Sequence, residues 1–182
     1  MACAGAPAAP DVSAVRVATA AQAGLASTSA SSLPGDLAAS VSFEPTGDAD
    51  FPLAMYQQAL ADGGAKLLVD RFEHSGGNPR IEDTVVLPFR GEEHLFVIAA
   101  WPIQHRGLGT TGTFYEIRAY RQDPTGRLQA NPGLARHLDI SGLEGSNDGE
   151  PSTFIGKDAN ELRALLQRAD AEGNGGEGDG GA

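Results

Sequence analysis

The segment 94–103 constrains the fold of this chain more than any other part of the sequence. Read as a strand, it is apolar on both faces, and the two sets of side chains are Leu95, Val97, Ala99 and Trp101 on one face and Phe96, Ile98 and Ala100 on the other. A strand of this kind belongs in the middle of a sheet that is covered on both sides. The sequence therefore predicts a central strand with other elements packed above and below it.

The rest of the foldable sequence supplies neighbours for this strand. Alternating apolar residues and turn signals predict further strands at 41–44, 65–73, 83–89, 113–121, 127–129 and 152–155. Gly-rich and polar connections are expected at 104–112 and 139–151, and a single helical turn at 131–137. We expect an α+β domain in which one antiparallel sheet of about five strands carries packed helices.

Two helices are predicted to cover this sheet. The first begins with Asp50 as cap and Pro52 in the first turn and ends at Gly63; its apolar residues at helical spacing are Leu53, Tyr56, Ala59 and Leu60. The second begins at Asp158, with Glu161 three residues later as in a capping box. Its apolar stripe consists of Leu162, Leu165 and Leu166.

The ends of the chain have a different composition from its middle. Residues 1–40 are dominated by Ala, Ser, Gly and Pro, and residues 169–182 form an acidic Gly-rich stretch. Neither stretch has enough apolar surface to offset the entropy of folding. We therefore expect a disordered tether at 1–40, one binding domain at 41–168 and a disordered tail at 169–182.

The chain is acidic, with a formal net charge of −11 over 182 residues. Within residues 41–168, 18 Asp and Glu face 12 Lys and Arg. This charge repels phosphate backbones and anionic lipids, so nucleic acid is not an expected partner, whereas a basic protein would be attracted. The same charge also serves solubility.

The single cysteine, Cys3, lies in the sequence Ala2-Cys3-Ala4-Gly5. This setting resembles the end of a bacterial lipobox, where a cysteine after a small residue is lipidated once a signal peptide is removed. The resemblance implies a periplasmic protein anchored to the outer membrane through Cys3, although the charged and apolar parts of a signal peptide are not in this sequence. The alternative is a cytoplasmic protein with an unstructured N-terminus.

Binding residues are expected at the 104–112 connection and on the strand that follows it. The connection has Gln104, His105 and Arg106 at its root, and loops on a rigid scaffold often carry binding. Its Gly107–Gly112 segment matches the spacing of a dinucleotide motif, but a strand rather than a helix is predicted next, so nucleotide binding is not expected. An ordinary wide hairpin is the alternative.

One face of the strand at 113–121 combines aromatic side chains with an ion pair: Phe114, Glu116, Arg118 and Tyr120. The opposite face, with Tyr115 and Ile117, is apolar. Aromatic residues and arginine are favoured in protein interfaces, so the mixed face is a second candidate for partner binding. The alternative is that these side chains form a cross-strand ladder beneath a helix.

The remaining motifs do not match the patterns of known metal or catalytic sites. The loop 139–150 begins with Asp and ends with Glu, but Glu144 stands where a calcium-binding EF-hand loop needs glycine, which leaves only a looser site at Asp139, Asn147 and Asp148. The four histidines lack the spacing of metal ligands, and no nucleophile elbow is present. We expect neither a metal nor a cofactor, and no enzymatic activity.

Two resemblances suggest a function. The stretch from Gly112 to Asp123, Gly126-Arg-Leu, the segment 139–145 and the closing helix together resemble small bacterial lipoproteins that act as immunity proteins beside effectors of type IV or type VI secretion systems. Separately, Thr111-Gly-Thr-Phe-Tyr115 is similar to the Ser-Gly-x-x-Tyr loop of periplasmic lysozyme inhibitors, with Thr111 in place of the serine. In that family the loop enters the cleft of the hydrolase and occupies its catalytic carboxylates.

The resemblances imply that the protein binds and inhibits a basic, lysozyme-like peptidoglycan hydrolase. Thr111 and Tyr115 would carry inhibition, although the alternation of the strand places Tyr115 on its apolar face. The residues expected to contact the partner are Gln104, His105, Arg106, Thr110, Thr111, Phe114, Tyr115, Arg118 and Tyr120. Two alternatives are an envelope lipoprotein with a general scaffold role, acting through Phe114 and Tyr120, and a hydrolase with its site at His105.

Overall fold

The structure is a computed structural model that describes residues 31–32, 39–59, 65–135, 138 and 140–174. Its strands are β1 (Ser31–Ser32), β2 (Ala39–Pro45), β3 (Leu53–Ala59), β4 (Leu67–Phe72), β5 (Arg80–Phe89), β6 (Glu92–His105), β7 (Thr110–Gln122), β8 (Leu128–Ala130), β9 (Ser141–Asn147) and β10 (Glu150–Ser152). Its helices are α1 (Pro132–Ala135), α2 (Ala159–Asn174) and a short 3₁₀ helix at Arg106–Leu108.

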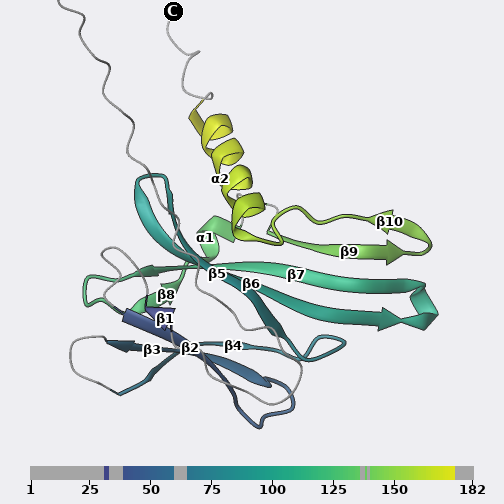
Figure 1. Ribbon diagram of the computed structural model, residues 1–182, viewed down its shortest axis with the longest axis horizontal. Coiled ribbons are helices and arrows are strands. Elements are labelled where there is room, and N and C mark those ends of the chain that lie inside the picture. The colour runs from purple at the N-terminus through teal and green to yellow at the C-terminus, as the bar shows by residue number, and fades with distance from the viewer. Residues whose placement is uncertain (1–30, 33–38, 60–64, 136–137, 139, 175–182) are drawn as a thin grey trace, which may run out of the picture.

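The strands form two antiparallel sheets that pack face to face (Figure 1). The first sheet has the order β1-β2-β3-β4. The second has the order β10-β9-β7-β6-β5, with β8 paired to one end of β7. In Figure 1 the first sheet lies below the second, and α2 lies above it, so the second sheet is the middle layer of three.

The two faces of β6 are buried in two separate cores, as its sequence predicts. Leu95, Val97 and Trp101 face the first sheet, together with Met55 and Phe72 from that sheet. Phe96 and Ile98 face the helical side, where the core also contains Val85, Ile117, Phe154, Leu162 and Leu166. Every residue of β6 from Leu95 to Trp101 is at most 1% exposed.

The predicted single sheet with packed helices is wrong, because one side of the middle sheet is covered by a second sheet. The decisive error concerns the predicted helix that begins at Asp50, since Leu53–Ala59 is the strand β3. Leu53, Met55 and Gln57 alternate toward the first core, and Gln57 is buried because its side-chain amide bonds the carbonyl of Gly126 and the N–H of Leu128. Residues 60–64, which include the predicted stop at Gly63, lie outside the described residues.

Asp48 rather than Asp50 organises the segment that leads into β3. The Oδ1 atom of Asp48 accepts hydrogen bonds from the N–H groups of Asp50 and Phe51, which closes a turn. The carbonyl oxygen of Asp50 accepts a bond from the N–H of His74, which ties the turn to the chain that follows β4. The polar residues that predicted a helix start therefore form a turn between β2 and β3.

The predicted polar loop at 139–151 is also wrong, because Ser141–Asn147 and Glu150–Ser152 pair as the hairpin β9–β10. The predicted strand at 152–155 overlaps this hairpin only at Ser152. Both ends of the 104–112 connection extend into β6 and β7, which leaves only residues 106–109 between the two strands.

The second predicted helix is confirmed, with Asp158 as its cap. Oδ1 of Asp158 accepts bonds from the N–H groups of Asn160 and Glu161, at 2.7 and 3.0 Å. Glu161 accepts hydrogen bonds from the N–H groups of Gly156 and Lys157, which lie two residues and one residue before the cap residue that a standard capping box would use. α2 continues to Asn174, past the predicted domain limit at 168, and Ala169 packs against the core.

Candidate functional site

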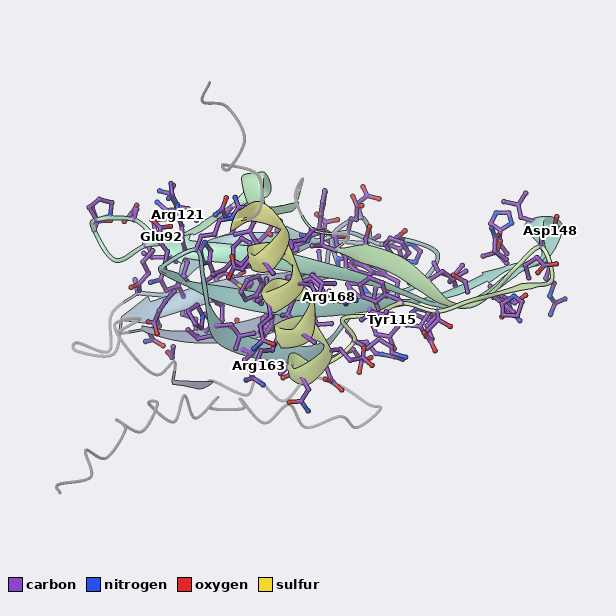
Figure 2. All side chains as sticks on the ribbon, turned by 90° about the horizontal axis from the view of Figure 1, so that it is seen from above. Glu92, Tyr115, Arg121, Asp148, Arg163 and Arg168 are labelled. Atoms are coloured by element: carbon purple, nitrogen blue, oxygen red, sulfur yellow. The ribbon has the colours of Figure 1, made fainter. Side chains whose placement is uncertain are left out.

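The most prominent feature of the surface is an arm that extends away from the three-layered body. We define the arm as residues 102–113 of the β6–β7 hairpin together with residues 142–152 of the β9–β10 hairpin. Figure 2 shows it in profile, with Asp148 at its far end and α2 over the body. The arm ends in two exposed turns, at 104–109 and 147–150.

The arm is one continuous piece of sheet. β6 pairs with β7 as far as the rung between His105 and Thr110, and β7 pairs with β9 from Glu116 and Ser141 out to Thr111 and Ser146. Beyond this ladder the hydroxyl of Thr110 donates a hydrogen bond of 2.7 Å to the side-chain oxygen of Asn147. The two turns are therefore held side by side.

Each turn has backbone angles that suit its position. Gly109 adopts a left-handed conformation (φ 61°) where the 3₁₀ helix ends, and it lies against the backbone of Asp148. Asp148 and Gly149 have φ values of 51° and 82° between β9 and β10. Two successive positive φ values match the twist of the flanking strands, so this turn continues the arm without splaying it.

A pair of facing glycines marks the middle of the arm. Gly112 and Gly145 are register partners, with φ values of 147° and 153°. A Cβ on Gly112 would lie 2.2 Å from the carbonyl oxygen of Glu144, and a Cβ on Gly145 would lie 2.2 Å from that of Thr111. Both positions require glycine, because any side chain would collide with the backbone of the adjacent strand.

Several of the residues predicted to bind a partner lie on this arm. Gln104, His105, Arg106 and Thr111 are exposed, and Thr110 is half-buried by its bond to Asn147. Within the part of the chain that the structure describes, Arg106 has no acidic partner. Arg106 is therefore available to an external group.

Leu108 is a site residue that sequence reasoning missed. Leu108 is 64% exposed, the largest value among the exposed large apolar residues of the described chain. The signal in the sequence was its place between Gly107 and Gly109, because neither neighbour has a side chain that covers it. Leu108 thus presents an isolated apolar group at the end of the arm.

Thr111 and Tyr115 lie within β7 rather than in a loop. They are four residues apart and therefore point to the same face, about 13 Å apart along the strand. Thr111 is on the exposed part of the arm, whereas Tyr115 is half-buried and stacks on Phe154 with ring centroids 5.8 Å apart. Burial, assisted by the charge of Glu82, raises the pKa of the Tyr115 hydroxyl.

The mixed face of β7 is turned toward the first sheet. Tyr120 is fully buried, and its hydroxyl bonds Oδ2 of Asp70 at 2.5 Å. Burial raises the pKa of this hydroxyl, and so does the negative charge of Asp70. Phe114 is half-buried and packs against Trp101, with ring centroids 6.2 Å apart.

Arg118 completes the same network between the sheets. It bonds Asp70 at 3.2 Å and Glu116 at 2.8 Å, and its guanidinium lies 4.6 Å from the centre of the Phe72 ring. Burial works to lower the pKa of Arg118, but the hydrogen bond and charge of Glu116 and the charge of Asp70 outweigh it and raise the pKa. Arg118 and Tyr120 thus join the two sheets, and Tyr120 has no free surface.

The base of the arm is joined to the helical side. Oε2 of Glu144 accepts a 2.9 Å bond from the N–H of Phe154, and Oε1 pairs with Nζ of Lys157 at 3.2 Å. These two contacts, in that order, lower the pKa of the Glu144 carboxyl. The Glu144 carboxylate therefore connects β9 to the segment that begins α2.

The remaining candidate groups are dispersed. His94 is buried, with Nδ1 on the carbonyl oxygen of Glu92 and Nε2 on the amide of Asn131, whereas His74 and His105 are exposed. No group of three or more His, Cys, Asp or Glu side chains with metal-binding geometry occurs among the described residues.

The structure describes only some of the remaining candidates from the sequence. Asn147 and Asp148 of the looser calcium site are at the arm's tip, while its third member, Asp139, is outside the described residues, as are His137 and Cys3. The strand predicted after the Gly107–Gly112 segment is confirmed as β7.

The helices of the described chain include none that is long and apolar enough to cross a membrane. No protein-family model matches this sequence, and no match was found among curated proteins or among solved structures.

Proposed function

We propose that this chain is a protein-binding domain that inhibits a peptidoglycan-degrading, lysozyme-like enzyme by inserting the tip of its arm into the enzyme's cleft. In this proposal it acts as an immunity protein against an effector of a secretion system. The observation that carries the proposal is the exposed arm tip, which ends in Arg106 and Leu108, two side chains without partners in the described chain. The sequence resemblance to lysozyme inhibitors supplies the class of partner.

The construction of the arm suits insertion into a cleft. Its four strands span about 14 Å between the outer axes, since neighbouring strands are about 4.8 Å apart. The Thr110–Asn147 bond and the ladder between β7 and β9 hold the tip in one shape before binding. A preformed element loses little conformational entropy on association, which favours tight binding.

The charge of the chain supports the same class of partner. The net charge of −11 would accelerate association with a basic enzyme, because complementary charges raise the rate of encounter. At the tip itself, Arg106 is a cation that can pair with carboxylates inside such a cleft. The negative net charge of the chain thus attracts the enzyme at long range, whereas the positive side chain of Arg106 makes the local contact in the cleft.

The location that we propose is the periplasm, with Cys3 lipidated and the domain held at the outer membrane by the N-terminal segment. The support is the Ala2-Cys3-Ala4-Gly5 sequence and the 27 residues between Cys3 and Ser31, where β1 begins. The alternative scaffold role through Phe114 and Tyr120 is less well supported, since Tyr120 is buried between the sheets.

Inhibition can be tested directly with purified lysozyme-class enzymes and a peptidoglycan suspension, by following the loss of turbidity. We expect molar excess of this protein to slow lysis by at least one basic enzyme. The double variant Arg106→Ser/Leu108→Ser should lose the effect. The matched control Arg163→Ser/Ile155→Ser, which changes a cation and an apolar residue on the helical side, should retain it. Unchanged lysis with every enzyme would defeat the proposal.

A further inference from the structure

We infer that the arm tip docks in one orientation, with Leu108 in an apolar pocket at the end of the partner's cleft, the β6–β7 turn against acidic groups and the β9–β10 turn against basic groups. This inference rests on the proposed function and specifies the chemistry of the cleft. It follows from three features of the tip, which are the exposure of Leu108, the separation of charge between the turns and the bond that joins them.

The exposure of Leu108 is unusual for its position. Exposed single apolar residues are common on protein surfaces, but this one lies at the end of an arm, between two glycines, with 64% of its surface open. Its backbone is held by the 3₁₀ helix and the left-handed Gly109. A rigid, projecting apolar side chain suits the centre of an interface, where a pocket can surround it.

The two turns carry opposite charges. The β6–β7 turn has the cation Arg106 beside His105, and the β9–β10 turn has the anions Asp148 and Glu150. None of these four side chains takes part in an ion pair within the described chain. The two turns lie side by side, yet no ion pair within the described chain joins them, so each turn presents its own sign of charge.

The charges are held in place relative to Leu108. The Thr110–Asn147 bond lies next to both turns, and a Cβ on Gly109 would lie 3.3 Å from the Cα of Asp148. A rotation of the tip by half a turn would bring each charge against the wrong wall of the cleft. Like charges brought together oppose binding, which makes one orientation preferred.

A charge swap separates oriented docking from general electrostatic attraction. The double variant Arg106→Glu/Asp148→Lys leaves the net charge unchanged, because one substitution removes two positive units and the other restores them. We would measure the Kd of wild type, this swap and Leu108→Ala for an enzyme that the wild type inhibits, with Leu67→Ala on β4 as the control. Leu67 is also exposed, at 46%.

We expect the swap to raise Kd by about 10-fold or more, and Leu108→Ala by about 30-fold, as for the removal of a central anchor. Leu67→Ala should bind as wild type does. Wild-type affinity for the swap would overturn the inference while leaving the proposed function intact. If the wild-type chain inhibits none of the enzymes, the proposed function fails, and the inference fails with it.

Discussion

Replacement of Gly112 by alanine is the perturbation that most sharply tests the geometry of the arm. The added methyl group would lie 2.2 Å from the carbonyl oxygen of Glu144, far inside van der Waals contact. The obstructing atom belongs to the backbone of β9, so it cannot move away as the end of a side chain can. The backbone itself is at φ 147°, a conformation that L-residues with side chains rarely adopt.

The free energy of unfolding that Gly112→Ala loses can be bounded in two ways. If the strands stay paired, backbone strain adds about 1–3 kcal/mol and the steric overlap about 1–3 kcal/mol. If instead the arm separates beyond the rung of Gly112 and Gly145, about three hydrogen bonds are lost, at about 1 kcal/mol each. The variant adopts whichever of the two states costs less free energy. We therefore expect Gly112→Ala to lower the free energy of unfolding by about 2–3 kcal/mol, or Tm by about 8–12 °C.

Thermal unfolding followed by circular dichroism would measure the loss, and hydrogen exchange would show where the structure opens. Gly149→Ala is the matched control, because Gly149 lies in the same arm with φ 82° and a methyl group added there would have no atom within 4 Å. Gly149→Ala should lower the free energy of unfolding by only about 1–2 kcal/mol, the cost of a left-handed backbone for a residue with a side chain. Equal Tm values for Gly112→Ala and Gly149→Ala would refute the argument from close strand approach.

Three further substitutions test contacts between the two sheets, at the start of α2 and at the base of the arm. Tyr120→Phe removes the bond to Asp70 and should cost about 1.5–3 kcal/mol in urea unfolding, since the acceptor is charged; a loss below about 0.5 kcal/mol would contradict this role. Asp158→Ala removes the cap of α2 and should cost about 0.5–2 kcal/mol, with faster amide exchange in the first turn; an unchanged exchange rate there would count against it. Glu144→Gln should lower Tm at neutral pH. Because the folded pKa of Glu144 lies below its ordinary value of 4.5, its contribution is complete above that pH and is lost as the pH falls through the folded value. A Tm difference that persists unchanged at a pH of about 2 would oppose this assignment.

The middle sheet could be predicted because β6 has an unambiguous pattern. Its two faces are apolar throughout 95–101, and the structure buries each face in its own core, as the alternation requires. The sequence does not reveal what covers each face. Helices and sheets both bury apolar surfaces, and the choice between them depends on neighbouring segments with weaker patterns.

β3 shows why the sequence predicts a helix where the structure has a strand. The segment 53–59 has apolar residues that fit both a helical and an alternating period, and only the alternating one requires Gln57 to be buried. A buried glutamine is stable here because its amide bonds the backbone of Gly126 and Leu128, about 70 residues away. No local feature of the sequence predicts these distant hydrogen-bond partners.

The arm was predicted in part. The glycines and polar residues of 104–112 predict an exposed connection with His105 and Arg106, whereas those of the partner hairpin predict only a loop. β9 is rich in glycine and serine, with low intrinsic strand propensity, and it is a strand because β7 provides its ladder. The requirement for Gly112 and Gly145 likewise follows only from their position opposite each other.

The central claim is that the tip of the arm is the surface that meets a partner. The most direct measurement is hydrogen exchange of the full chain, alone and bound to a lysozyme-class enzyme that it inhibits. We predict protection of the backbone at 105–110 and 146–150, with exchange along the exposed side of α2 unchanged. Protection centred on α2 or on the first sheet, with both turns of the arm exchanging as in the free protein, would contradict the account.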